Sequence, residues 1–346
     1  MEGGSNDTPV VQHLTEIGAI DTFTVVDIGC SGGISPTWRQ FGATLCAWGF
    51  DPDVQDVERV RQEETLDGVT YVAAYAGLEP SHPFHTKRGA GEPWSRNPWG
   101  RLSVAYALDV LRQRTLTNPQ RTEANIWSDV ELATESQTVV VPEHLVANGV
   151  ASVDFLKIDV DGVDLEVLHS FDPALESLQI TGACLEVNFF GSECETDNTL
   201  HNTDRFMKAH GFELFNLTLR RYSMAALPRP FVSHVPSPTT SGRVLQGDAI
   251  YFRDLGSDEH ADFSKALAPG KILNLICAFA VCNLPDCAAE VAIRFEESIS
   301  PLCSVARVLD LLAAQAQADQ EVKLSYAELL SRFDAQDPMF FNASLG

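Results

Sequence analysis

Residues 154–168 read DFLKIDVDGVDLEVL, and this stretch decides the fold. It begins as an apolar run that contains Lys157, continues through Asp159 and Asp161, and then becomes amphipathic. A short apolar run bounded by turn residues indicates a buried strand, and apolar residues at three- and four-residue spacing indicate a helix. The predicted helix buries the residues that share its apolar face, which are Val163, Val167, Leu168 and Phe171. A strand that passes directly into a helix is the repeating unit of α/β proteins.

Seven other apolar segments have the length and composition of strands. They are residues 23–29, 44–51, 69–77, 137–141, 180–190, 212–219 and 247–254. Helical segments alternate with them, and the best defined begins with Ser35 as N-cap and Pro36 as its first residue. Because parallel strands need crossover helices, this alternation predicts an α/β fold whose mainly parallel sheet has helices on both faces.

The 346 residues are long for a single core, so we expect a main domain and an appendage. Residues 1–255 carry the alternation of strands and helices, which an insertion at about residues 79–132 interrupts. Residues 256–346 have helical spacing and form a predicted C-terminal extension. This extension could cover a sheet edge, mediate a homo-oligomer or dock on a glycan-assembly partner, and its residues favour none of the three.

The formal net charge of −24 argues against a nucleic-acid-binding surface, which needs a basic footprint, and against docking on anionic membranes. The amino terminus has no basic region followed by an apolar block, and no stretch reaches the roughly 18 uninterrupted apolar residues of a membrane span. The 8 cysteines include no CxxC pair and suit reduced thiols. We therefore expect a cytoplasmic protein that has no transmembrane segment and binds no nucleic acid.

Residues 25–33, VVDIGCSGG, place a glycine-rich turn where the first strand meets the first helix. Ligands of open α/β sheets bind over the carboxyl ends of the strands, and glycines let the backbone approach them closely. A dinucleotide site favours GxGxxG, whereas this chain has GxxGG after Asp27. A carboxylate repels a pyrophosphate but attracts the ammonium and sulfonium groups of S-adenosylmethionine.

Asp51 ends the second predicted strand and could accept hydrogen bonds from a ribose, a device that dinucleotide sites also use. The candidate cofactor-binding residues are therefore Asp27, Gly29, Ser31, Gly32, Gly33 and Asp51. A turn with a helix N-cap and no ligand is the alternative interpretation.

Four motifs, VVDIGCSGG, FDPD, VDFLKIDVDGVDLEVL and CLEVNFF, occur in this order and resemble the FkbM family of S-adenosylmethionine-dependent methyltransferases. The resemblance covers about residues 20–255 and is strongest at KIDVDG, where the family usually has Glu at the position of Asp161. It implies a Rossmann-like class I methyltransferase fold with a seven-stranded, mostly parallel sheet. It also implies S-adenosylmethionine as cofactor and an oxygen of a glycan, glycolipid or secondary metabolite as methyl acceptor.

Methyl transfer to a hydroxyl needs the acceptor oxygen, the methyl group and the sulfur in line, and a group that removes or tolerates the hydroxyl proton. Asp159 and Asp161 follow the central strand and are the candidate bases. Lys157 is a third candidate catalytic residue, although a structural pair with a strand-end carboxylate is the stronger interpretation. The two aspartates could instead only cap the following helix.

Asp159, Glu186 and Asn188 come from the ends of neighbouring predicted strands and carry the oxygen ligands that Mg²⁺ prefers. This set resembles the metal site of catechol O-methyltransferases, and a bound divalent metal would lower the pKa of the acceptor hydroxyl. A metal-free site with Asp159 or Asp161 as base or positioning group is the alternative.

The insertion is rich in arginine and tryptophan, although the chain as a whole is acidic. Arginine forks suit phosphate or carboxylate, and a tryptophan face suits a sugar ring. We expect an acceptor lid that recognises an anionic glycan or a nucleotide-linked sugar through Trp94, Arg96, Trp99 and Arg101. Residues 220–222 could face the same ligand. A solvated loop whose arginines pair with the chain's own carboxylates is the alternative.

These observations favour an O-methyltransferase that acts on a carbohydrate, a glycolipid or a glycosylated metabolite. Two alternatives stay open. The first is a nicotinamide-dependent oxidoreductase, which the GxxGG spacing and the KIDVDG motif disfavour. The second is a non-catalytic module that keeps the fold and serves in protein interactions.

Overall fold

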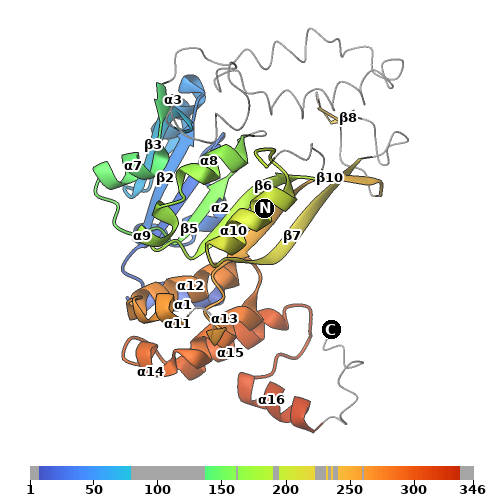
Figure 1. Cartoon of the computed structure of the whole chain (residues 1–346). Coiled ribbons are helices and arrows are strands. Elements are labelled where there is room, and N and C mark those ends of the chain that lie inside the picture. The colour runs from blue at the N-terminus through green and yellow to red at the C-terminus, as the bar shows by residue number, and fades with distance from the viewer. Residues whose placement is uncertain are drawn as a thin grey trace.

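The computed structural model describes residues 8–78, 137–160, 163–189, 195–222, 231–232, 235–236, 241–258 and 261–335. In this part of the chain, a central sheet has helices on both faces, and a further group of helices lies at one end of the sheet (Figure 1). None of the described helices is long and apolar enough to cross a membrane. The α/β class predicted from the sequence is confirmed.

The main sheet of the described residues has eight strands in the order β4-β3-β2-β1-β5-β6-β10-β7. Their bounds are β1 (Phe23–Ile28), β2 (Leu45–Asp51), β3 (Val69–Ala76), β4 (Gln137–Val139), β5 (Phe155–Ile158), β6 (Gly182–Asn188), β7 (Glu213–Tyr222) and β10 (Arg243–Phe252). The strand β10 runs antiparallel to both of its neighbours, and the other pairs are parallel. A separate two-stranded sheet consists of β8 (Phe231–Val232) and β9 (Val235–Pro236).

The expectation of seven strands, which came from the family resemblance, is wrong for this chain. The shortest strand of the main sheet is β4, which pairs in parallel with the end of β3 at one edge of the sheet. Its apolar segment, residues 137–141, has the composition of a strand, but only three residues pair because helix α7 (Val141–Ala147) begins immediately afterwards. Each of the eight segments with strand composition contributes a strand to the sheet.

Side chains alternate between the two faces of the sheet, and a hydrophobic cluster lies on each face. On β5, Phe155 and Lys157 lie on one face, here named the Phe155 face, whereas Leu156 and Ile158 lie on the opposite face. The Phe155 face packs against α1 (Pro9–Glu16), α2 (Pro36–Arg39) and α3 (Val54–Glu63). The opposite face packs against α7, α8 (Asp164–Ser170), α9 (Ala174–Ser177) and α10 (Leu200–Ala209). The four apolar residues predicted to be buried along α8 are buried.

Capping side chains fix where the helices near the strand ends begin. The Ser35 hydroxyl accepts a hydrogen bond from the Thr37 backbone N–H, and Pro36 is the first residue of α2, as predicted. The Asp53 carboxylate accepts from the first turn of α3 in the same way. Between α2 and β2, a 3₁₀ turn (Gly42–Thr44) leads the chain into β2. These caps set the paths of the loops that leave the carboxyl ends of β1 and β2.

The described part of the predicted C-terminal extension is helical. Its helices are α11 (Ala261–Lys265), α12 (Pro269–Val281), α13 (Pro285–Arg294), α14 (Glu296–Ile299), α15 (Val305–Ala316) and α16 (Tyr326–Asp334). Helix α12 lies below the sheet in Figure 1, next to α1, and its residues share one hydrophobic cluster with the Phe155 face. The seven cysteines of the described part are all free, as predicted, and five of them are buried.

Candidate functional site

The strand order reverses between β1 and β5, because the chain adds β2, β3 and β4 on one side of β1 and then β5 on the other. Ligands of open α/β sheets bind outside the carboxyl ends of the strands at such a reversal. The loops after β1 and β5 meet there: a Cβ atom at Gly29 would collide with the carbonyl oxygen of Asp159, and Gly29 has a φ of +83°. Only glycine allows this approach.

Lys157 lies between the carboxylates at the ends of β1 and β5. Its Nζ is 3.0 Å from Asp27 Oδ1 and 3.6 Å from Asp159 Oδ2, and it donates to the Gly29 carbonyl oxygen at 3.3 Å. Burial acts to lower the pKa of Lys157, but the Asp27 and Asp159 carboxylates outweigh it and the pKa is raised. The lysine therefore stays charged and compensates Asp27, whose side chain is only 3% exposed. This geometry favours a structural pair, and a catalytic role for Lys157 stays a prediction.

Asp159 and Asp164 have different surroundings although they lie five residues apart. The Asp159 side chain is 40% exposed at the carboxyl end of β5. Asp164 is buried at the start of α8, where its carboxylate accepts hydrogen bonds from the Val160 backbone N–H at 2.9 Å and from Asn198 Nδ2 at 2.8 Å. The third aspartate of the DVDGVD run thus fixes the turn that carries Asp159. Sequence reasoning gave it no role, although an acid in the first turn of a helix was a usable signal.

The glycine-rich loop after β1 is held by its own backbone and by α3. Gly33 N–H donates to the Cys30 carbonyl at 2.7 Å, and Gly32 N–H donates to Asp56 Oδ2 at 2.8 Å. The Gly32 N–H bond is the main reason that the pKa of Asp56 is lowered. Ser31 is exposed at the tip of this loop. The predicted loop residues are therefore brought together at the carboxyl end of β1.

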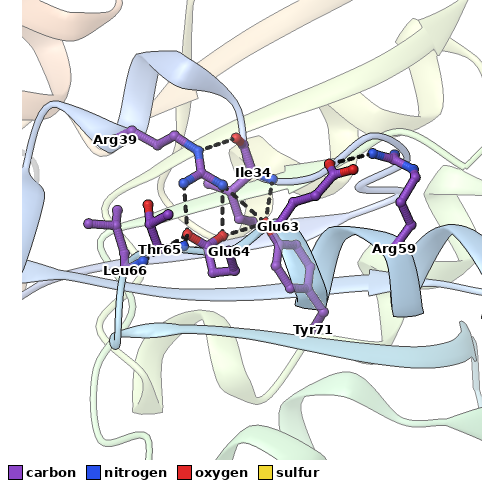
Figure 2. Close-up of polar contacts among 8 residues, drawn as sticks. All are labelled: Ile34, Arg39, Arg59, Glu63, Glu64, Thr65, Leu66 and Tyr71. Carbon is purple, nitrogen blue, oxygen red and sulfur yellow. Dashed lines mark hydrogen bonds and ion pairs between the residues drawn. The ribbon is translucent and has the colours of Figure 1, made fainter.

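A polar network on the Phe155 face clamps the residue that follows the glycines (Figure 2). Ile34 N–H donates to Tyr71 Oη at 3.1 Å, and Ile34 C=O accepts from Arg39 Nε at 3.1 Å. Arg39 makes two bonds to the Glu64 carboxylate, at 2.8 and 2.7 Å, and Tyr71 Oη donates to Glu64 at 2.9 Å. A Cβ atom at Gly33 would lie 3.0 Å from Tyr71 Oη. We name Arg39, Glu64 and Tyr71 the Ile34 clamp; no motif of the sequence predicts it.

The clamp has one protonation state over a wide pH range. Hydrogen bonds from Arg39 lower the pKa of Glu64 to about 2. Burial raises the pKa of Tyr71 to about 12. The carboxylate and the phenol therefore keep their roles as acceptor and donor between these values.

Asp51 ends β2 beside the loop, as predicted. It is buried, and its Oδ1 accepts a hydrogen bond from the Asp53 backbone N–H at 2.8 Å. Burial raises the pKa of Asp51. The carboxylate is thus fixed in place at the neighbouring strand end, where a ribose would reach it if the loop binds a nucleoside.

The predicted metal site is not supported. The described residues contain no group of three or more His, Cys, Asp and Glu side chains that could hold a metal ion. Glu186 Oε1 lies 2.7 Å from Arg220 Nη2, which is also 2.9 Å from Asp248 Oδ1. A guanidinium that already compensates Glu186 competes with any cation for that carboxylate. The residue types of Glu186 and Asn188 suit a metal, but no local pattern in the sequence indicates that β7 supplies this arginine.

Several predicted residues lie outside the described part of the chain. They are Asp161 and the lid residues Trp94, Arg96, Trp99 and Arg101. Their roles, and the lid itself, stay predictions. Of the segment 220–222, Arg220 pairs with Glu186 and Asp248, as given above.

The fold defines a class: an α/β protein with a mainly parallel sheet, in which the carboxyl ends of the strands are where ligands of such sheets bind. The model of the methyltransferase FkbM domain matches residues 104–214 of the chain, a range that includes Lys157, Asp159 and Glu186. This match confirms the resemblance to the FkbM family over residues 104–214. It begins after the β1 loop, so the assignments of Asp27 and Asp51 depend on the geometry.

Comparison with curated proteins gave no match. Similar solved structures include a TehB-like SAM-dependent methyltransferase from Corynebacterium glutamicum, with 12% identity, a TM-score of 0.29, and coverage of 72% of this chain and 90% of that chain. Precorrin-6y C5,15-methyltransferase from Geobacter metallireducens has 11% identity, a TM-score of 0.31, and coverage of 70% and 87%. M. jannaschii TYW2 in complex with AdoMet has 7% identity, a TM-score of 0.26, and coverage of 73% and 78%. At these values, the three structures say nothing about individual residues of this chain.

Proposed function

We propose that the chain is an S-adenosylmethionine-dependent O-methyltransferase that acts on a hydroxyl of a carbohydrate, a glycolipid or a glycosylated metabolite. The observation that carries the proposal is the meeting of the Asp27–Gly29 loop, Lys157 and Asp159 at the reversal of strand order. The match to the methyltransferase FkbM domain supports it. The acceptor class is what the family resemblance implies.

The residues at the strand ends fit S-adenosylmethionine. Nothing lies within 4 Å of the place that a Cβ atom of Gly32 would take, so the loop backbone is open to close approach by a ligand at that residue. Among the described residues at these strand ends, the carboxylates of Asp27, Asp51 and Asp159 outnumber the ammonium of Lys157, so this group carries a net negative charge. That charge suits a ligand with a sulfonium and an ammonium. When bound, this cofactor supplies an electrophilic methyl group on a positively charged sulfur.

The chain's own residues then orient the acceptor and accept its proton. The bound cofactor would supply the methyl group, and the acceptor hydroxyl would lose its proton as it takes that group. The hydroxyl proton passes to Asp159, whose exposed carboxylate is placed at the carboxyl end of β5. Lys157, 3.6 Å away, keeps this carboxylate oriented, and the Ile34 clamp keeps the loop in the shape that binds the cofactor.

Calorimetric titration with S-adenosylhomocysteine tests this proposal directly. The full chain is titrated with and without Mg²⁺, beside an NAD⁺ titration. We expect a micromolar Kd for S-adenosylhomocysteine, no dependence on Mg²⁺, and no NAD⁺ binding. Absence of binding by demonstrably folded protein would overturn the cofactor assignment and favour a non-catalytic module. Binding of NAD⁺ alone would favour the oxidoreductase.

A further inference from the structure

Four polar side chains lie on the Phe155 face of strands β6, β10 and β7, which follow β5 and its Lys157–Asp27 ion pair in the order of the sheet. Glu186 and Asn188 belong to β6, Asp248 to β10 and Arg220 to β7. The strand register sets Asp248 opposite Glu186, and it sets Gln246 opposite both Asn188 and Arg220. We name Glu186, Asn188, Arg220 and Asp248 the β6 cluster. Three adjacent strands therefore supply one continuous polar patch.

The Phe155 face is apolar at one end and polar at the other. At the amino ends of β1 and β5 it is covered by α12: the rings of Phe252 and Phe279 have centroids 4.1 Å apart. Four residues from Phe252 on β10, the Asp248 side chain is 26% exposed, and Arg220 is 31% exposed. A sheet face that only packed against helices would be apolar along its whole length. The polar end is instead accessible from solvent, on the same face as the Lys157 pair.

Asn188 supplies an independent observation. It is 5% exposed, and its side-chain oxygen Oδ1 has no hydrogen-bond partner in the described residues. Asn188 lies two residues from Glu186 on the same strand, so both side chains share the Phe155 face. Buried polar oxygens without a donor are rare because they cost free energy. Such an oxygen is expected where a ligand brings the missing donor.

The charges of the β6 cluster favour a neutral ligand rich in hydroxyls. Arg220 lies 2.7 Å from Glu186 and 2.9 Å from Asp248, so two carboxylates surround one guanidinium and the cluster keeps a net negative charge. An anionic group is repelled there. Carboxylate and amide oxygens accept hydrogen bonds from hydroxyls, and the guanidinium donates to hydroxyl or ring oxygens.

We propose that the β6 cluster is the subsite that binds the non-reacting hydroxyls of the methyl acceptor, and that it takes a neutral sugar ring. The inference rests on the proposed function, because the cluster would hold the sugar on the face where Asp159 receives the proton. It deepens that function by naming the residues that recognise the acceptor and the charge state of the group they take.

Saturation-transfer NMR with defined sugars tests the subsite. The full chain, with and without saturating S-adenosylhomocysteine, is mixed with methyl α-glucopyranoside, methyl α-mannopyranoside, methyl α-galactopyranoside and methyl α-rhamnopyranoside. Glucosamine and glucose 6-phosphate serve as the cationic and anionic comparisons. We expect ring-proton signals from at least one neutral glycoside and none from the phosphate. Asn188→Leu should reduce the signal about tenfold, because the site loses its amide acceptor.

Asn188→Leu also separates recognition from folding. Because the Asn188 oxygen has no partner in the described residues, the substitution should leave the melting temperature unchanged or higher and S-adenosylhomocysteine affinity unchanged. The matched control is Asn216→Leu, at an exposed asparagine of β7, which should keep the sugar signal.

Two results would overturn the subsite. The first is a lower melting temperature in Asn188→Leu with an unchanged sugar signal, which would show a structural role. The second is a panel in which only glucosamine or the phosphate gives a signal, or in which no sugar does. If S-adenosylhomocysteine binds and no sugar does, the subsite fails while the proposed function stands. If S-adenosylhomocysteine does not bind, the samples without it still test the subsite.

Discussion

A lysine inside a buried strand is costly unless its charge is compensated, and Lys157 meets that requirement with two carboxylates and a carbonyl oxygen. The register sets it directly opposite Asp27 across β1 and β5. The ion pair therefore ties together the two strands whose ends carry the glycine loop and Asp159. In the proposed function, the lysine of the KID motif orients Asp159, which accepts the proton of the acceptor hydroxyl.

Lys157→Met should lower the free energy of unfolding by about 3–5 kcal/mol, because it leaves Asp27 buried without a compensating charge. Urea denaturation measures the change. The double variant Asp27→Asn with Lys157→Met removes both charges and should recover most of the loss. An equal loss in the single and double variants would show that the packing of the lysine stem, and not its charge, is what stabilises the strand pair.

The Ile34 clamp binds the N–H and the C=O of the same residue, and so holds the peptide groups on both sides of Ile34; we expect it to control the loop conformation more than the overall fold. Tyr71→Phe removes the acceptor of the Ile34 N–H and should weaken S-adenosylhomocysteine binding about tenfold, the effect of one lost hydrogen bond. Calorimetric titration measures the Kd. Tyr326→Phe, in α16, is the matched control and should keep wild-type affinity. Unchanged affinity in Tyr71→Phe would show that the loop keeps its shape without the clamp.

Glu64 gives the clamp a defined pH dependence. Its pKa is lowered to about 2 in the folded chain, mainly by Arg39, whereas an unperturbed glutamate has a pKa near 4.5. A lowered folded-state pKa contributes stability that is present above the unfolded value and is lost as the pH falls toward the folded value. Wild type should therefore lose stability relative to Glu64→Gln between about pH 4.5 and pH 2. Denaturation curves at pH 7, 4.5 and 3 measure this; a constant difference across them would contradict it.

At the scale of elements, α12 packs against the sheet through a buried ion pair as well as apolar contacts. Lys271 Nζ is 2.8 Å from Asp154 Oδ1 and donates to the Val153 carbonyl at 2.7 Å. The other Asp154 oxygen accepts from the Thr24 backbone N–H at 2.7 Å. One carboxylate thus joins α12, β1 and the start of β5 at the end of the sheet opposite the proposed cofactor site.

Lys271→Met should destabilise the chain by about 3–5 kcal/mol, since Asp154 then stays buried without its cation. It should leave the Kd for S-adenosylhomocysteine unchanged, because the pair lies at the amino ends of the strands. Urea denaturation and calorimetric titration measure the two effects. A large loss of affinity in this variant, under conditions where it is folded, would show that α12 controls the distant site.

The sequence predicted elements better than contacts between elements. Apolar runs identified all eight strands of the main sheet, and the signal is clearest at β1 and β6, whose residues are buried on both faces. Strand β10 lies between β6 and β7 and runs antiparallel to both, and the side-chain contacts that this order creates leave no local signal in the sequence. Arg220 of β7 reaches Glu186 of β6 across the intervening β10, and without knowledge of this contact the oxygen ligands of β6 were interpreted as a metal site. Tyr71 was likewise only an aromatic residue of a strand until β3 came to lie beneath the glycine loop.

At the scale of the whole molecule, the two ends of the sheet have different roles. The amino ends of the parallel strands are closed by α1 and the C-terminal helices, whose apolar residues belong to the same cluster as Phe23, Phe155 and Phe252. The carboxyl ends carry the charged groups of the proposed cofactor and acceptor sites. The closed end gives the open end a rigid support, which a site needs to hold reacting groups in line.

The division into residues 1–255 and 256–346 stays a prediction, and the shared cluster leads to a test of it. If both parts contribute to one core, the full chain should unfold in a single calorimetric transition whose calorimetric and van't Hoff enthalpies agree. Saturating S-adenosylhomocysteine should then raise the melting temperature of that single transition, because a ligand stabilises the complete cooperative unit to which it binds. Two resolved transitions, of which only one responds to the ligand, would instead show that the C-terminal helices fold as a separate domain. In that case, Lys271→Met should lower the melting temperature of the transition that the ligand does not shift, or lower the melting temperatures of both transitions.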